Sequence, residues 1–105
     1  MRPADFQKTV AAQLDRIEAE MKASGLWQDE PLKPEQLQFS EAFAMDTMVF
    51  EQWLQFVFVP RVREAVAENS FPDSSSVGAQ AVREFDTVPQ ANELVVLLSE
   101  FDALF

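Results

Sequence analysis

The segment from residue 43 to residue 61 constrains the fold of this chain more than any other. Apolar side chains fill so many of its positions that a helix built from them is apolar on nearly every side. Such a helix belongs at the centre of a protein core. It is too short to cross a bilayer, which needs about 20 apolar residues. Its apolar run is also interrupted by Glu51, Gln52 and Gln55.

Both ends of this central helix carry recognisable signals. Asp46 and Thr47 are residue types that cap helix N-termini, so the sequence predicts a helix that starts at Thr47 with Asp46 as its cap. Pro60 lies inside the apolar pattern, where it removes one backbone hydrogen bond and clashes with the carbonyl of Phe56. We therefore expect a kink or short break near Pro60, followed by helix to about Asn69.

Three further helices are indicated by apolar spacing. The first runs from about Pro3 to Ser24, and Gly25 is placed to end it in the left-handed conformation. Another begins after a cap at Ser75 or Ser76, and the last follows Pro89. The expected inner residues are Phe6, Val10, Leu14, Ile17 and Met21 in the first helix, Val77, Ala81, Val82 and Phe85 in the next, and Leu94, Val95, Leu97, Leu98, Phe101 and Leu104 in the last.

These patterns predict one all-α domain spanning residues 1–105, an antiparallel bundle of four main helices with short loops. A short extra helix can start near Pro34 and reach about Ala44. Apolar residues make up 48% of the chain, which favours a globular protein over a disordered one. Two glycines are too few for a turn-rich β protein.

The charge of the chain is strongly negative and unevenly distributed. The net charge is -10, from 18 acidic and 8 basic residues. Residues 64–105 hold eight of the acids and one base, Arg83. Nucleic-acid binding depends on neutralising phosphates, so direct contact with RNA or DNA is disfavoured. The same charge can simply keep a Phe-rich protein soluble, or it can face a basic surface of a protein partner.

The residue types that usually perform catalysis are missing. The chain contains no His, Cys or Tyr, which removes the usual general bases, thiol nucleophiles and transition-metal ligands. No phosphate loop, calcium loop, dinucleotide fingerprint or nucleophile elbow occurs. We therefore expect a protein that is not an enzyme, with no cofactor and no metal. The absence of a signal core and of a membrane span predicts a cytoplasmic location.

Five residues are candidates for an interaction surface: Trp27, Phe43, Asp46, Trp53 and Arg61. Trp and Arg dominate the energetic centres of protein interfaces, and these side chains could border a groove that holds a peptide or helix. The alternative is that both Trp residues are core and that Asp46 is only a helix cap.

Arg61 has a second arginine close by in the sequence. On a helix, Arg61 and Arg63 point about 200° apart and cannot form one clamp. We expect one of them to pair with a nearby acid and the other to be available to a partner.

The sequence resembles the signature of the YqcC-like family of bacterial proteins. The resemblance rests on residues 43–48 (FAMDTM), 51–55 (EQWLQ) and 59–61 (VPR), and extends to residues 26–27 (LW), 71–72 (FP) and 97–105 (LLSEFDALF). Ala42 departs from the pattern, because the family has a proline there. The resemblance implies an all-helical cytoplasmic bacterial protein, and it implies no activity. Members of the family are often encoded beside, or labelled after, a tRNA pseudouridine synthase of the C type, which points to such an enzyme as a partner.

Three functions are compatible with these observations. The first is a non-catalytic accessory module that binds another protein, such as a tRNA-modifying enzyme. The second is a small-molecule-binding protein or enzyme with an apolar pocket between helices, in which Asp46 and Arg61 could supply polar groups. The third is a self-associating module that forms a homodimer.

Overall fold

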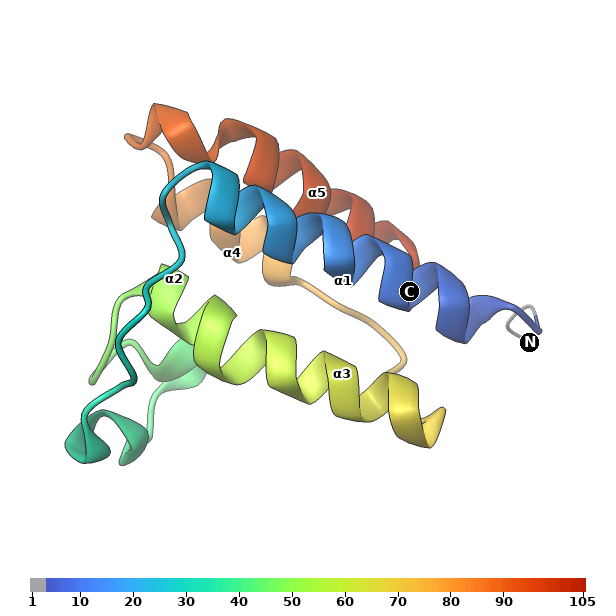
Figure 1. Ribbon diagram of the computed structural model, residues 1–105, viewed down its shortest axis with the longest axis horizontal. Helices are drawn as coiled ribbons and strands as arrows, with labels where there is room; N and C mark the ends of the chain where they lie inside the picture. The colour runs from blue at the N-terminus through green and yellow to red at the C-terminus, as the bar shows by residue number, and fades with distance from the viewer. Residues whose placement is uncertain (1–3) are drawn as a thin grey trace.

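All regular elements in residues 4–105, the part of the chain that the computed structural model describes apart from the Ala42 side chain, are helical (Figure 1). The predicted all-α fold is therefore confirmed. The elements are α1 (Phe6–Ala23), the 3₁₀ turns η1 (Pro34–Leu37) and η2 (Ala42–Ala44), α2 (Phe50–Trp53), the π-helical segment η3 (Leu54–Phe58), α3 (Val59–Glu68), α4 (Val77–Glu84), the 3₁₀ turn η4 (Pro89–Ala91) and α5 (Asn92–Ala103).

The elements assemble into four helical rods, as predicted. α2, η3 and α3 follow one another without interruption and form one rod, called here the central rod (residues 50–68). Figure 1 shows α1 and α5 side by side, with α4 against α5 and the central rod facing α1. The chain direction reverses from each rod to the next, so the bundle is antiparallel. No helix in the described part of the chain is long and apolar enough to span a membrane.

The first rod keeps the predicted inner stripe, because Phe6, Val10, Leu14, Ile17 and Met21 are all buried. The predicted start at Pro3 lies outside the described residues. Gly25 adopts a φ of 78°. The Leu26 N–H donates to the carbonyl of Met21 and the Gly25 N–H to that of Lys22, which is the hydrogen-bond pattern that commonly ends a helix at a left-handed glycine.

The central rod stays helical through Pro60, and its irregularity takes the form of a π-helical turn. The Val59 N–H donates to the carbonyl of Leu54, five residues earlier instead of four. A wider turn gives the proline ring room where an α turn would press it against the Phe56 carbonyl. Pro60 thus lies in the first turn of α3, where its missing N–H costs least.

The predicted start of the central helix is wrong. The helix begins at Phe50 after Val49, and not at Thr47 after Asp46. The Asp46 carboxylate instead accepts hydrogen bonds from the N–H groups of Ser40 and Glu41. A carboxylate that is engaged by a preceding loop cannot cap the helix that follows it.

The extra short helix predicted from Pro34 to Ala44 is also not a single element. Two 3₁₀ turns, η1 and η2, are separated by residues 38–41. The backbone N–H groups of Ser40 and Glu41 bind the Asp46 side chain, so they do not continue a helical ladder. Local side-chain acceptors compete with helix formation in this way.

The N-terminus of α4 is capped from another helix. The Asp102 carboxylate, on α5, accepts hydrogen bonds from Val77 N at 3.0 Å and Gly78 N at 2.7 Å, and from the Ser75 hydroxyl. Ser76 occupies the predicted cap position, but its side chain makes no capping hydrogen bond. A charge-assisted tertiary bond therefore replaces the local cap.

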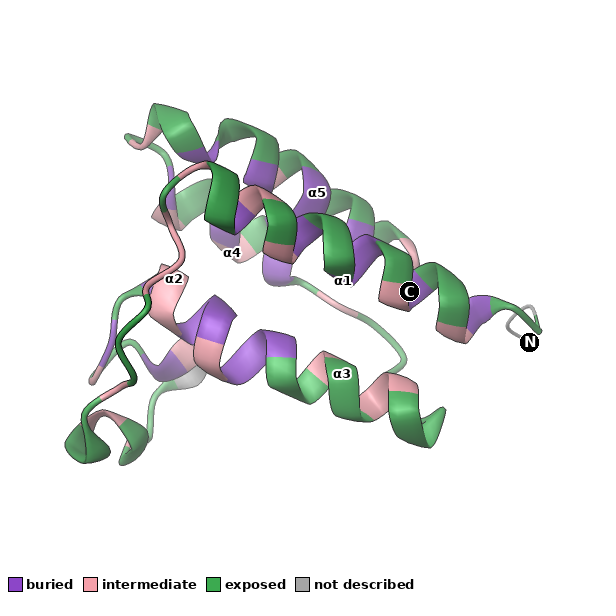
Figure 2. Cartoon of the chain, in the orientation of Figure 1, coloured by how far each residue is buried: buried purple, intermediate pink, exposed green. Residues whose placement is uncertain are grey.

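The buried face of α4 differs from the prediction at one residue. Val77, Ala81 and Phe85 are buried as expected, but Val82 is 56% exposed. The close packing of α4 on α5 requires a small residue, and Gly78 provides it: a Cβ there would lie 2.6 Å from the Ser99 Cα. This contact sets the rotation of α4 and leaves Val82 on the outer side. Figure 2 marks the buried residues in purple along the rods; in the central rod they are concentrated before α3 turns exposed toward its C-terminal end.

Replacing Asp102 with alanine should lower the free energy of unfolding by about 1–3 kcal/mol, because three donors lose a charged acceptor. Urea unfolding monitored by circular dichroism measures the change. Glu100→Ala is the control: it removes an exposed acid from the same helix and should change stability by less than about 0.5 kcal/mol. Equal effects of the two variants would contradict the capping role.

Gly78→Ala should also destabilise the fold, by about 1–3 kcal/mol, because the new methyl group overlaps the α5 backbone. Helix propensity alone predicts the opposite sign, a gain of about 1 kcal/mol. Ala79→Gly, at the exposed neighbouring position, measures that propensity within the same helix. A higher unfolding midpoint for Gly78→Ala would show that α4 and α5 are not in close backbone contact.

Candidate functional site

The glutamines of the EQWLQ string attach the first loop to the central rod. Gln55 is buried, and its side chain binds the backbone of Gln28 in both directions: Nε2 donates to the Gln28 carbonyl at 2.7 Å and Oε1 accepts from its N–H at 2.9 Å. Gln52 Nε2 donates to the Gln28 side-chain oxygen at 3.1 Å. Its own side-chain oxygen accepts from the Val49 N–H. The motif therefore positions loops on both sides of η1 and η2.

A second pair of bonds closes the loop between residues 36 and 47. The Thr47 hydroxyl donates to the Gln36 carbonyl at 2.7 Å, and Gln36 Nε2 donates to the Thr47 carbonyl at 3.2 Å. Sequence reasoning did not identify Gln36, Gln52 or Gln55 as organising residues. For Gln52 and Gln55 the available signal was their place in the family string EQWLQ, because a polar residue in an otherwise apolar helix must find partners. Gln36 lies outside the family strings and carried no such signal.

Asp46 organises the middle of this loop. Hydrogen bonds from the Ser40 backbone N–H, and then from the Glu41 N–H and the Ser40 hydroxyl, hold the pKa of the Asp46 carboxyl below its ordinary value. The side chain therefore stays ionised near neutral pH and ties residues 40–41 to the turn at 44–47. Its role in this structure is to shape the loop.

Two consecutive residues of η2 adopt left-handed backbone conformations, with φ of 58° at Phe43 and 53° at Ala44. Such conformations strain residues other than glycine and persist where the surroundings enforce them. Phe43 is held by ring contacts, with its centroid 4.9 Å from that of Trp53 and 5.9 Å from that of Phe50. The aromatic side chains of the rod thus fix the shape of the loop that covers them.

The same loop exposes apolar side chains. Leu37, Met45 and Val49 are each more than half exposed, and we call them the outer loop surface. They make up three of the five large apolar side chains that are at least half exposed among the described residues. Glu51 and Glu84 border a shallow hollow that Met45 and Val49 line. Apolar side chains rimmed by charge are typical of interaction surfaces.

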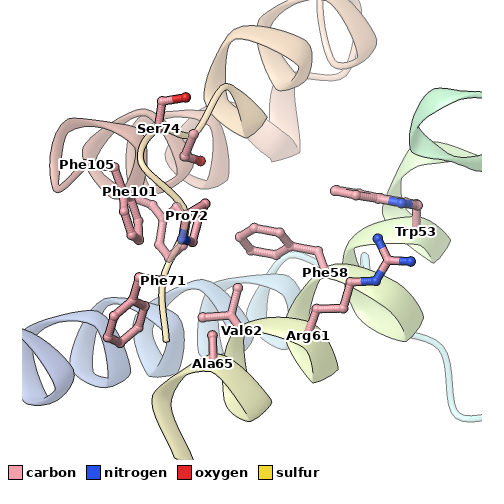
Figure 3. Close-up of a pocket in the computed structure, with 11 residues that line it drawn as sticks. Trp53, Phe58, Arg61, Val62, Ala65, Phe71, Pro72, Ser74, Phe101 and Phe105 are labelled. Carbon is pink, nitrogen blue, oxygen red and sulfur yellow. The ribbon is translucent and has the colours of Figure 1, made fainter. Parts of the chain in front are cut away.

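A second candidate region lies between the central rod, α5 and the connection between α3 and α4. It is a cavity of about 200 Å³, called here the aromatic pocket (Figure 3). Its lining residues are Trp53, Phe58, Arg61, Val62, Ala65, Phe71, Pro72, Ser74, Ser75, Phe101 and Phe105.

The aromatic pocket was not predicted as a unit. The ring centroids of Phe58 and Phe101 are 5.2 Å apart, and those of Phe101 and Phe105 are 5.1 Å apart. Phe58 and Phe101 are 43 positions apart in the sequence, so only the folded chain brings them together. The i, i+4 spacing of Phe101 and Phe105 was a signal for a shared helix face.

The structure brings together some of the five predicted interaction residues and separates others. Phe43 contacts Trp53, and Trp53 and Arg61 line the aromatic pocket. Trp27 instead folds back on the last turn of α1, with the Lys22 ammonium 4.9 Å from its ring centroid. Asp46 lies in the loop described above, and neither Trp27 nor Asp46 lines the aromatic pocket.

The two arginines of α3 have different environments, as expected from their divergence. Arg63 binds Asp15 at 2.8 Å and Glu18 at 3.2 Å on α1. The hydrogen bond with Asp15 is the largest cause of a raised pKa of the Arg63 guanidinium, and the bond with Glu18 adds to it. The pKa of Glu18 is lowered, first by the hydrogen bond from Lys22 and then by Arg63. The Arg61 side chain makes no ion pair with any residue from 4 to 105.

Metal-binding chemistry is not evident in the described part of the chain. No group of three or more acidic side chains is placed there to hold an ion. The outer loop surface and the aromatic pocket are both formed mainly by apolar side chains, with charged residues at their edges.

Comparison with known proteins places the chain among small bacterial proteins. Residues 9–104 match the family described as DUF446: tRNA pseudouridine synthase C. An uncharacterised protein of Haemophilus influenzae is 32% identical over 91 residues, covering 83% of this chain and 86% of that protein. The uncharacterised protein YqcC of Escherichia coli is 29% identical over 99 residues, covering 91% and 90%.

One relative differs from these in length. A protein of Pectobacterium carotovorum subsp. carotovorum named tRNA pseudouridine synthase C is 39% identical over 56 residues. The match covers 53% of this chain but 15% of that protein, so most of that protein lies outside the similarity.

The fold agrees with an experimental structure. The solution NMR structure of YqcC from Escherichia coli superimposes with a TM-score of 0.82 at 27% sequence identity, covering 94% of this chain and 86% of that one. The sequence match spans nearly the whole chain and the fold is shared, so this chain belongs to the YqcC-like family, DUF446.

Proposed function

We propose that this chain is a non-catalytic cytoplasmic module that binds tRNA pseudouridine synthase C. The observation that carries the proposal is the 39% identity between 56 residues of this chain and a segment of a much longer protein with that name. When a segment and an enzyme are joined in one protein, the link keeps the segment at a high effective concentration relative to the enzyme. A separate chain of the same family can keep that association through an interface.

The charge of the chain supports a protein partner of this kind. An enzyme that acts on tRNA needs a basic surface, because RNA binding depends on neutralising phosphates. This chain carries a net charge of -10 and is therefore suited to contact such an enzyme and not its RNA. Complementary charge also speeds the encounter of two proteins.

The outer loop surface is the contact region that we assign. Leu37, Met45 and Val49 present apolar area, and Glu51 and Glu84 beside it can meet basic side chains. The backbone of this loop is held by the Asp46 and Gln36 hydrogen bonds. A preorganised surface loses little entropy on binding, which suits a loop that serves as an interface.

The absence of His, Cys and Tyr from the sequence supports a non-catalytic role. Carboxylates, Lys, Arg, Ser and Thr remain as reactive groups, and the described carboxylates whose pKa shifts are resolved, Glu18 and Asp46, both shift downward. A general acid needs a raised carboxyl pKa. Both of these side chains are instead set up as structural hydrogen-bond acceptors.

The purified chain should form a one-to-one complex with tRNA pseudouridine synthase C from the same organism, as measured by isothermal titration calorimetry and light scattering. Binding should weaken when the salt concentration is raised from about 50 mM to about 300 mM, because exposed charges are screened. A chain that stays monomeric and binds no enzyme at micromolar concentrations would contradict the proposal.

Val49→Asp should weaken this complex at least about tenfold, because it removes apolar contact and adds a further negative charge to the interface. Val96→Asp is the matched control, since Val96 is 50% exposed and Val49 is 54% exposed. Val96 lies on α5, away from the outer loop surface, and its variant should bind within about twofold of the original protein. Equal losses for both variants would exclude the outer loop surface as the contact region.

A further inference from the structure

We propose that the aromatic pocket binds a small carboxylic acid, with the apolar part of the acid between the rings and its carboxylate on the Arg61 guanidinium. This site is separate from the outer loop surface and does not depend on the enzyme partner. It is built from the central rod, α5 and the connection between α3 and α4.

The walls of the pocket are aromatic and come from three directions. Phe58, Val62 and Ala65 come from the central rod, Phe101 and Phe105 from α5 and the residues that follow it, and Phe71 and Pro72 from the connection. Figure 3 shows these side chains around a common space, with Phe58 reaching toward the connection. Surfaces of this composition favour a flat or branched apolar group.

The size of the cavity limits the ligand. A volume of about 200 Å³ falls below the range of about 300–1,000 Å³ that holds drug-sized ligands. It is comparable to an engineered apolar cavity of about 150 Å³ that binds benzene in another protein. The pocket therefore fits a single ring or a short alkyl chain.

The charge at the pocket selects an anion. The chain has 18 acidic and 8 basic residues, yet among residues 4–105 the lining includes Arg61 and no acidic residue. In Figure 3 the Arg61 side chain extends past Phe58 toward Trp53. Arg63, two residues later, is held by Asp15 and Glu18, whereas Arg61 makes no ion pair with the described residues. Its guanidinium can therefore bind a carboxylate, and can do so with two hydrogen bonds.

The remaining charge of the protein favours a ligand with one negative charge. A net charge of -10 repels anions over a distance of several ångströms. That repulsion grows with the charge of the ligand, while Arg61 supplies a single positive charge. Phosphate monoesters and polyanions are therefore disfavoured relative to a monocarboxylate. Within residues 4–105 the other lining residues with polar side chains are Ser74 and Ser75, and the Ser75 hydroxyl is bonded to Asp102.

The test uses Trp53 as a reporter inside the pocket. The chain has two tryptophans, so Trp27→Phe leaves Trp53 as the sole source of indole fluorescence. Phenylacetate, its neutral isostere phenylacetamide, and acetate are titrated into this protein. Phenylacetate should change the fluorescence saturably, phenylacetamide should bind about tenfold more weakly, and acetate should give no saturable change.

A second substitution isolates the carboxylate contact. Arg61→Gln in the same background should bring phenylacetate down to the affinity of phenylacetamide, while leaving the amide affinity unchanged. Arg83→Gln is the control, because it removes an equal charge from the exposed surface of α4 and should keep the preference for the acid. Circular dichroism confirms that each variant is folded.

Three results would overturn the proposal. The first is equal binding of acid and amide to the protein that retains Arg61. The second is the absence of saturable binding for phenylacetate, both by fluorescence and by ligand-observed NMR. The third is a dimer in light scattering whose formation alone shields Trp53, since the pocket would then be filled by a second copy of the chain.

Discussion

The fold depends on burying a helix that is apolar on nearly every side. From Trp53 to Val59 the central rod exposes little except Phe56, which is partly buried. Three neighbouring helices cannot surround it completely, so the loop from residue 26 to residue 49 covers the remaining side. Because the rod must be covered by loop as well as helix, this loop is structurally as important as the bundle.

Polar side chains fix the loop to the central rod and α4 to α5 through directional hydrogen bonds, which apolar contacts do not provide. Gln55 binds the backbone of Gln28 inside the core, and Asp102 caps α4 from α5. Burying such groups is favourable only when their hydrogen bonds are satisfied. They therefore specify one arrangement of loop and helix, while the surrounding Phe, Leu and Val residues supply most of the stabilisation.

Periodicity alone was sufficient to predict the four rods and most of the buried face of each. Apolar spacing is a local property of the chain, so it survives into the fold wherever a helix forms. Caps were harder to predict. Asp46 and Ser76 both have cap-forming side chains. The Asp46 carboxylate is engaged by Ser40 and Glu41, however, and at the start of α4 Asp102 takes the place of the Ser76 side chain as the cap. A cap depends on which acceptor lies nearest in space, and sequence spacing does not show that.

The amino-acid sequence by itself determined an acidic, all-helical domain with a buried central helix, because helix type and burial follow from the order of apolar and polar residues. It also identified Trp53 and Arg61 as candidates. Only the tertiary structure decided that these two line one pocket with Phe71 and Phe105, and that Trp27 lies apart from it. A pocket is a relation between elements, and contacts between residues far apart in the chain, such as Phe58 of η3 and Phe101 of α5, set this one.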